Sequence, residues 1–341
     1  MNEATLITAE AAKDPAFGFG QPVSELYRDP AGYDPGADLR SAVDVSLLLG
    51  LPLLLTGEPG CGKTSVAHWL AWRLDLGDPL VYNVKSSSLG RDLLYEFDEL
   101  ARFRDSNAGE KQNSLNYLRL NALGLAILFS GDPQRTSGYE DLTYAGFAEA
   151  HMKRTGQKGP VATRFKRHVV LIDELDKAPR DTPNDLLAEI DEMEFRIREL
   201  DAVIAGEPKL RPVVVITSNS EKSLPEPFLR RCVFHHIKSP DDRRRRDIIE
   251  RRKHPFARRG PLYDEAMRFF DRLNVLSRAP GTAELLAWLT ALERVVQQQQ
   301  TGGQRPLASL KGMIKPSLGA LAKTNDDLEL TEREMRAAGL A

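Results

Sequence analysis

Short apolar runs and amphipathic stretches alternate along the first 240 residues. A strand that is covered on both faces has no polar side, so a continuous apolar run of this length favours a buried strand. Such runs occur at 51–56, 80–84, 168–172 and 212–217. Amphipathic patterns between them predict helices at 37–49, 64–74, 93–104 and 184–193. This alternation predicts the α/β class, a three-layer αβα fold with a parallel sheet.

The pattern changes after residue 238, where no further strand is predicted. Amphipathic periodicity predicts helices at 241–252, 263–276, 282–297 and 306–321. We therefore expect an αβα domain at 21–238 and an α-helical lid with C-terminal helices at 239–341. Residues 1–20 show no period and are expected to form a flexible arm, and the run Gln297 to Gln300 is interpreted as a linker.

Two segments inside the first domain do not fit a simple alternation of strands and helices. Residues 105–164 are rich in Gly, Asn and Ser around one predicted helix at 115–129, which is typical of an insertion. The segment Glu194 to Arg198 alternates between polar and apolar side chains, as one half of a hairpin does.

Charge and cysteine content narrow the class of protein. The chain has 47 basic and 49 acidic residues, so no overall field attracts it to nucleic acid or to an anionic membrane. The Arg-rich stretch at 243–246 is followed by Asp247 and Glu250 and has no aromatic ladder, which favours a solvated or inter-subunit helix face over a nucleic-acid site. Two cysteines, no secretory signal and no membrane-spanning run indicate a cytoplasmic protein.

A phosphate-binding loop stands between the first predicted strand and the following helix. Glycines allow the backbone to aim successive N–H groups at phosphate oxygens, and the helix N-terminus adds its positive dipole end. The pattern G-x-x-x-x-G-K-[ST] is matched in full. The segment consists of Gly57, Glu58, Pro59, Gly60, Cys61, Gly62, Lys63, Thr64 and Ser65. We expect Lys63 to pair with the β- and γ-phosphates of ATP and Thr64 to bind Mg²⁺.

Two acids follow the apolar strand at 168–172, at the sheet edge where ligands of open α/β sheets collect. Asp173 is the expected Mg²⁺ partner, and Glu174 is the expected general base that activates water against the γ-phosphate. The alternative for such an acidic pair is a helix cap, but the phosphate loop upstream favours the catalytic interpretation.

Polar residues after the last predicted strand complete the candidate site. Asn219 follows the strand at 212–217, and its amide has both the donor and the acceptor needed to orient water or sense the γ-phosphate. About ten residues later come Arg230 and Arg231, either of which could reach the phosphate of a neighbouring subunit as an arginine finger. The alternative for these arginines is a surface salt bridge.

These motifs resemble those of the MoxR-type AAA+ ATPases over roughly Gln21 to Trp288. The resemblance rests on GEPGCGKT, VVLIDELDKAP, VVVITSN and LPEPFLRRC. It implies a sheet order of 5-1-4-3-2, a helical lid, and hexameric rings with ATP at subunit boundaries. It also implies that Asn219 is sensor 1 and that Arg231 is the finger. The usual sensor 2 position holds Glu284, although Arg278 lies close enough in sequence to substitute.

The resemblance further implies chaperone-like remodelling of a protein client, typically a protein with a von Willebrand factor A domain. Two other functions compete with this interpretation. A DNA-directed AAA+ translocase or loader needs a basic pore hairpin, whereas the segment at 194–198 is mixed in charge. A nucleotide-dependent scaffold switch needs no hydrolysis, which the presence of Glu174 argues against.

Overall fold

The computed structural model describes residues 29–108, 113–157, 161–179, 182–219, 224–301 and 309–340, and the arm expected at 1–20 lies outside them. The chain divides into two compact units. Unit 1 comprises residues 1–34, 58–62 and 238–341, and unit 2 comprises residues 35–57 and 63–237. The boundary after residue 237 lies one residue from the one expected, but residues 29–34 and 58–62, which were expected in the αβα domain at 21–238, belong to unit 1 instead.

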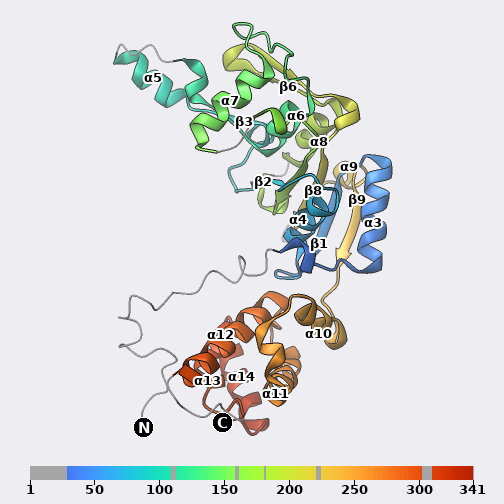
Figure 1. Ribbon diagram of the computed structural model, residues 1–341, viewed down its shortest axis with the longest axis vertical. Helices are drawn as coiled ribbons and strands as arrows, with labels where there is room; N and C mark the ends of the chain where they lie inside the picture. Colours follow the sequence, from blue (N-terminus) through green and yellow to red (C-terminus); the bar gives the residue numbers. More distant parts are fainter. Residues whose placement is uncertain are drawn as a thin grey trace. The chain divides into compact units, whose positions relative to one another are not determined.

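Unit 2 is built on a five-stranded sheet in which every neighbouring pair is parallel. Its strands are β1 (Leu53–Gly57), β2 (Leu80–Asn83), β5 (Val169–Asp173), β8 (Val213–Ser218) and β9 (Val233–Ile237). Their order across the sheet is β2-β5-β8-β1-β9 (Figure 1). Counted among the core strands alone, this is the expected 5-1-4-3-2. The strand labels in Figure 1 are not numbered 1 to 5, because the strands of two separate ribbons, β3-β4 and β6-β7, are counted among them.

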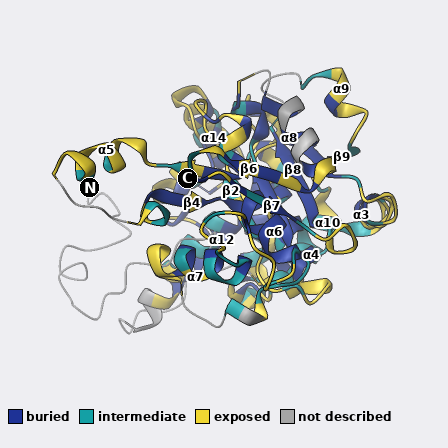
Figure 2. Cartoon of the chain, turned by 90° about the horizontal axis from the view of Figure 1, so that it is seen from above, coloured by how far each residue is buried: buried dark blue, intermediate teal, exposed yellow. Residues whose placement is uncertain are grey.

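Burial explains which strands could be predicted from the sequence. All residues of β1 and β8 are buried, β5 is buried except at its last residue, and each of these strands begins with at least three consecutive apolar residues. Figure 2 shows β8 in the dark blue of buried residues. In contrast, residues of the edge strand β9 alternate between half-buried and exposed, and its sequence includes His235 and His236. The sequence analysis did not predict β9, whose run is interrupted by these histidines. The other edge strand, β2, also alternates between half-buried and exposed residues, so the strand predicted at 80–84 is present but is not buried as expected.

Helices flank the sheet of unit 2. They are α3 (Gly36–Leu49), α4 (Lys63–Arg73), α6 (Ala122–Ser130), α7 (Tyr144–Thr155), α8 (Thr182–Glu192) and α9 (Glu226–Leu229). Every residue of α6 is buried, and the helix contacts β2 and β5. The expected insertion at 105–164 therefore contains a helix of the main core, whose apolar character on all sides is the result of complete burial.

A two-stranded ribbon and an exposed helix occupy the segment predicted as one helix at 93–104. Strand β3 (Tyr95–Phe97) pairs antiparallel with β4 (Leu118–Leu120), and Tyr95 is buried in that ribbon. Helix α5 (Glu99–Asn107) begins only after Asp98, whose carboxylate accepts the Ala101 N–H. No residue of α5 is buried, and the helix projects from unit 2 (Figures 1 and 2). The single-helix prediction was wrong in its first half.

The hairpin predicted at 194–198 is confirmed. Strand β6 (Glu194–Ile197) pairs antiparallel with β7 (Ala202–Ala205). Phe195 and Ile197 are buried on one face, while Glu194 and Arg196 are exposed on the other. This period of two is the pattern by which the sequence indicated a strand.

Unit 1 has a helical core around Trp288, whose indole N–H donates to Ser317 Oγ over 2.8 Å. Its helices are α10 (Asp242–Arg251), α11 (Pro261–Asp271), α12 (Thr282–Thr301), α13 (Ile314–Ser317) and α14 (Asn325–Ala337). The run Gln297 to Gln300 lies inside α12, so the linker interpretation was wrong, and glutamine is a good helix former. The predicted helix at 306–321 is reduced, within the described residues, to α13 and short turns after Gly312, which has a φ of 82°. Helix α14 was not predicted.

Short 3-10 turns connect the longer elements. They are Pro30–Gly32, Gly90–Leu93, Ser114–Tyr117, Val161–Thr163, Leu175–Lys177, Arg198–Leu200, Pro208–Leu210, Pro255–Arg259, Arg272–Val275 and Leu318–Ala320. Within the described parts of the chain, no helix has the length and the apolar character needed to cross a bilayer.

The arginines of α10 are largely neutralised inside unit 1. Arg244 Nη1 lies 2.7 Å from Asp34 Oδ2, Arg245 Nη2 lies 3.2 Å from Asp271 Oδ1, and Arg246 Nη1 lies 3.5 Å from Asp264 Oδ1. The sequence analysis expected a solvated or inter-subunit face here. These three side chains instead hold α10 to other parts of unit 1, and so they do not form an open basic patch.

Candidate functional site

The phosphate loop is closed by its own lysine. Strand β1 ends at Gly57, and the loop that follows has positive φ angles at Gly60 (77°) and Gly62 (95°), which glycine adopts without strain. Helix α4 begins at Lys63, so the helix N-terminus lies at the end of the loop. Lys63 is only 7% exposed, and its Nζ donates to Gly57 O over 2.8 Å. Local geometry thus agrees with the loop-to-helix arrangement expected from the sequence.

Thr64 and Asp173 are brought together from distant parts of the sequence. Thr64 Oγ1, in the first turn of α4, donates to Asp173 Oδ1 and Oδ2 over 3.2 and 3.3 Å. Asp173 is the last residue of β5. A hydroxyl and a carboxylate are hard oxygen donors of the kind that Mg²⁺ prefers. The residues present therefore fit the metal that the sequence analysis expected.

Thr217 connects the two acids of β5. Its hydroxyl donates to Asp173 Oδ1 over 2.6 Å and accepts the backbone N–H of Glu174 over 2.9 Å. Its side chain is completely buried. Glu174 lies in the left-handed region at φ 59° and ψ 49°, a conformation that costs a non-glycine residue about 1–2 kcal/mol. The Thr217 bond helps to hold Glu174 there, where β5 ends.

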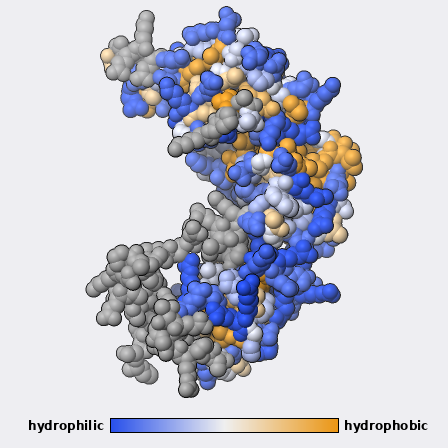
Figure 3. All heavy atoms as spheres, viewed as in Figure 1, coloured by the Kyte–Doolittle hydropathy of each residue, from blue (hydrophilic) through white to orange (hydrophobic). Residues whose placement is uncertain are grey.

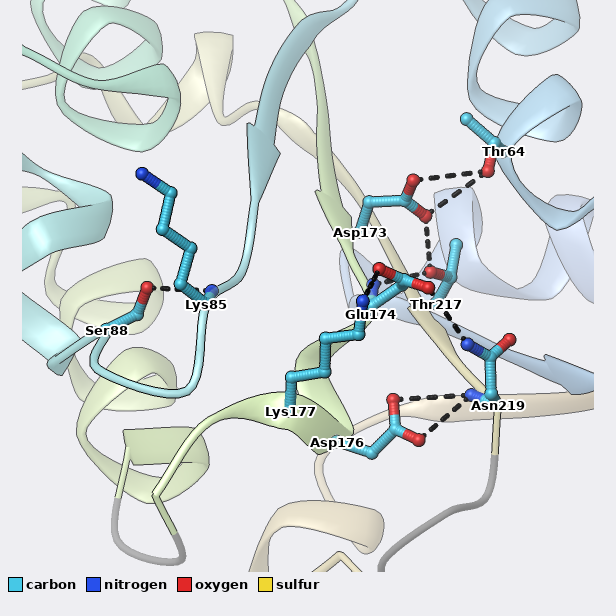
Figure 4. A network of polar contacts seen from close by, with 9 residues as sticks. All are labelled: Thr64, Lys85, Ser88, Asp173, Glu174, Asp176, Lys177, Thr217 and Asn219. Carbon is cyan, nitrogen blue, oxygen red and sulfur yellow. Dashed lines mark hydrogen bonds and ion pairs between the residues drawn. The ribbon is translucent and has the colours of Figure 1, made fainter. Parts of the chain in front are cut away.

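The Glu174 carboxylate is held by two partners (Figure 4). Asn219 Nδ2 donates to Glu174 Oε1 over 3.1 Å, and Lys177 Nζ forms an ion pair with Glu174 Oε2. Each carboxylate oxygen therefore has one partner from within unit 2. The expected base and the expected sensor residue are therefore in direct contact.

Asp176 fixes the backbone of Asn219. Its carboxylate is buried, and both of its oxygens accept the Asn219 N–H, at 3.3 and 3.1 Å. Because the backbone of Asn219 is anchored, its side chain can reach Glu174 from a defined position. Asp176 thus supports the contact between Asn219 and Glu174 by fixing the backbone of Asn219.

Three residues of this network were missed by the sequence analysis. Thr217, Asp176 and Lys177 all lie within motifs that it quoted, but no role was assigned to them. Available signals were the placement of Thr217 two residues before Asn219 and of Asp176 and Lys177 directly after the acidic pair. Those signals are weak because hydroxyl and charged residues are common at strand ends and in turns.

The tip of the phosphate loop, residues 58–62, is grouped with unit 1. Ser239 Oγ donates to Glu58 Oε2 over 2.6 Å. A Cβ on Gly62 would lie 3.2 Å from the ring of Tyr33, so the loop backbone passes close to this ring. Burial is the largest influence on the Tyr33 phenol and raises its pKa above the ordinary value. In the same part of the loop, Cys61 is half-buried, and a Cβ on Gly281 would lie 3.4 Å from Pro59 O.

The contacts of the described residues place neither candidate finger with Asp173 or Glu174. Arg230 Nε lies 3.1 Å from Glu226 Oε1, and both side chains are largely exposed. Arg231 is exposed between α9 and β9. The surface salt bridge, the alternative left open by the sequence, therefore describes Arg230.

The two candidates for the sensor 2 position lie in unit 1. Arg278 is exposed, and Asp327 accepts hydrogen bonds from the backbone and side chain of neighbouring Ser277 at 3.0 Å. Glu284 Oε2 accepts the Gly281 N–H over 3.1 Å, which caps the start of α12. A Cβ on Gly60 would lie 3.2 Å from the same Glu284 oxygen. Glu284 therefore has a structural function as a helix cap.

Comparisons with known proteins identify the family of the chain. The model of the ATPase family associated with various cellular activities (AAA) matches residues 53–240. No curated protein matches the chain. Among solved structures, the chain is similar to NtrX from Brucella abortus in complex with ATP, with 13% sequence identity and a TM-score of 0.44. The match covers 96% of this chain and 60% of the NtrX chain, so this chain spans less than two thirds of that structure.

Proposed function

Because this chain belongs to the AAA family of ATPases, whose model matches residues 53–240, we propose that it hydrolyses ATP in a magnesium-dependent reaction. The observation that carries this proposal is the continuous hydrogen-bonded chain from Thr64 through Asp173 and Thr217 to Glu174. It joins the end of the phosphate loop to the acids of β5. A structural role alone does not require a strained glutamate at the end of that chain.

The residues divide the work between binding and proton transfer. The loop amides and the N-terminus of α4 bind the phosphates, and Lys63 exchanges its bond to Gly57 O for phosphate oxygens. Thr64 and Asp173 would hold Mg²⁺, which would neutralise charge on the phosphates. Glu174 accepts a proton from the attacking water, and Asn219 holds the Glu174 carboxylate in place.

Two variants test this proposal. Lys63→Met is expected to abolish binding of a fluorescent ATP analogue, because the loop loses its only ammonium group. Glu174→Gln is expected to bind the analogue normally and to release phosphate at least about 100-fold more slowly. Lys153→Met and Glu149→Gln, which alter exposed residues of α7, are the matched controls. Normal phosphate release by Glu174→Gln would refute the assignment of the base.

We also propose that the active form is a homo-oligomeric ring. The size of the protein in solution is the first test. Val45, Leu48 and Leu49 form an apolar face on α3 and are 43%, 85% and 62% exposed. Figure 3 shows hydrophobic surface over this helix. Exposed apolar patches of this kind mark interaction sites, and Arg231 is exposed in the same unit. Leu48→Glu is expected to reduce the ATP-dependent oligomer seen by light scattering, whereas Leu100→Glu on α5 is not.

The finer function that we propose is MoxR-like remodelling of a protein client in the cytoplasm, with a von Willebrand factor A domain protein as the expected client. The internal ion pairs of α10 weigh against a DNA-directed motor, because they neutralise the arginines that would bind phosphate. Capture of one defined client by the Glu174→Gln variant in the presence of ATP tests this. Salt-sensitive binding to DNA, absent from an Arg244→Ala variant, would favour the motor instead.

A further inference from the structure

Lys177 is the second partner of the Glu174 carboxylate. It lies in the 3-10 turn Leu175–Lys177 that directly follows the acidic pair of β5. Its ammonium pairs with Glu174 Oε2, whereas Asn219 Nδ2 donates to Oε1. Figure 4 shows the two side chains reaching the carboxylate from two sides. The sequence analysis and the family match assign no role to this lysine.

Two partners on different oxygens restrict the carboxylate more than one partner does. The left-handed backbone of Glu174 and its bond to Thr217 fix where the side chain begins. A single hydrogen bond at Oε1 would still leave the carboxylate plane free to rotate about its terminal torsion, which is a broad one. The second contact, at Oε2, opposes that rotation. Each oxygen keeps a second lone-pair direction, so water can still approach.

The two partners come from different strand ends but share one support, because the turn Leu175–Lys177 contains both Lys177 and the Asp176 that anchors Asn219. Asn219 is anchored through its backbone by Asp176, while Lys177 reaches Glu174 from the turn on the same strand end. The Lys177 and Glu174 side chains are 42% and 37% exposed, so their ion pair contributes little to the stability of the fold. Its effect is therefore on the orientation of the carboxylate.

We propose that Lys177 is a positioning residue for ATP hydrolysis, which holds the Glu174 carboxylate in the orientation that accepts a proton from water. This inference rests on the proposed function. It differs from a contact between Lys177 and the nucleotide, because a positioning residue acts on turnover and leaves the affinity for ATP unchanged. Misorientation of a reacting group is enough to slow an enzyme markedly.

The test compares Lys177→Met, which keeps an unbranched side chain one atom shorter and removes the charge, with Lys177→Arg, which keeps the charge. For Lys177→Met we expect kcat to fall about tenfold. KM, the Kd of a fluorescent ATP analogue and the thermal midpoint are expected to stay unchanged. Lys177→Arg is expected to recover most of the lost kcat. Lys153→Met on α7 serves as the control for removal of an exposed lysine.

Each other outcome overturns the inference. Unchanged or increased kcat in Lys177→Met would show that the ion pair does not orient the base productively. A matching increase in KM and Kd would show that Lys177 binds nucleotide instead. Failure of Lys177→Arg to recover activity in a folded protein would remove the requirement for a cation. An active wild type with a normal Lys177→Met overturns this inference alone, whereas an inactive wild type overturns the proposed function with it.

Discussion

The Thr217 hydroxyl donates a hydrogen bond to Asp173 Oδ1 over 2.6 Å and thereby couples two neighbouring strands at their carboxyl ends. Strands β5 and β8 pair in parallel with Ile172 opposite Ile216, so the residues that follow each of them lie side by side. The same hydroxyl accepts the Glu174 N–H. One small side chain thus sets the positions of the expected metal ligand and the expected base.

Replacement of Thr217 by valine keeps the shape of the side chain and removes the hydroxyl. We expect kcat for ATP hydrolysis to fall by about 10- to 100-fold, because Asp173 and the Glu174 amide lose their common partner. The unpaired amide is expected to destabilise the fold by about 1–3 kcal/mol. Steady-state phosphate release and urea unfolding measure the two effects. Thr331→Val, which alters a buried threonine of unit 1, should lose stability without this loss of kcat.

Gly124 marks a close approach between α6 and the backbone that precedes β3. A Cβ at this position would lie 2.1 Å from Leu94 O and 2.9 Å from Leu94 C. Because these are backbone atoms, they cannot move aside as a flexible side chain can. We expect Gly124→Ala to destabilise the protein by about 3 kcal/mol. Gly319→Ala is the control, because a Cβ there meets nothing within 4 Å. Equal thermal midpoints for the two variants would contradict the close packing of α6.

Two buried histidines should make the protein less stable in mild acid. Burial is the main cause that lowers the pKa of His151 and of His168 to about 4. His151 Nδ1 accepts the Leu120 N–H, so protonation there breaks a bond. Between about pH 6.5 and pH 4 the unfolded chain binds protons that the folded chain excludes. The stability present above pH 6.5 is therefore lost as the pH falls.

We expect the free energy of unfolding to drop by about 2 kcal/mol per histidine between pH 7 and pH 5. Urea unfolding at the two pH values measures it. His151→Gln and His168→Gln each remove one titrating group and should reduce the difference accordingly. A wild type with equal stability at both pH values would show that these rings are not held neutral.

Arg231 is the expected finger, and Arg230 already pairs with Glu226. We expect Arg231→Ala to lower ATP hydrolysis at least about 100-fold, because an arginine finger stabilises charge on the phosphates of the neighbouring subunit. Mixed with wild-type protein, its subunits should reduce activity by more than their share. Arg230→Ala is the matched control. A loss strictly proportional to the fraction of variant would exclude action between subunits.

Strands and helices with a clear pattern of apolar residues were predicted well. Elements whose apolar pattern is mixed, or whose flanking segments are polar, were missed or misassigned. Within the strands predicted at 168–172 and 212–217, residues 169–172 and 213–216 are all apolar because layers cover both faces of the sheet there. Strand β9 has the mixed composition of an edge and was missed, although its backbone pairs fully with β1. Helix α6 was assigned to an insertion because the surrounding segment is polar, while the helix itself is buried in the core.

The sequence by itself determined the phosphate loop, the acidic pair Asp173 and Glu174, and the α/β class, because each depends on residues that are adjacent or regularly spaced along the chain. Only the tertiary structure decided which side chains support them. Thr217 is 44 residues from Asp173, and it becomes its neighbour only through the parallel pairing of β5 with β8. Asn219 is 45 residues from Glu174 and reaches it through the same pairing of strands, whereas Lys177 is a local partner, brought to Glu174 by the turn that follows β5.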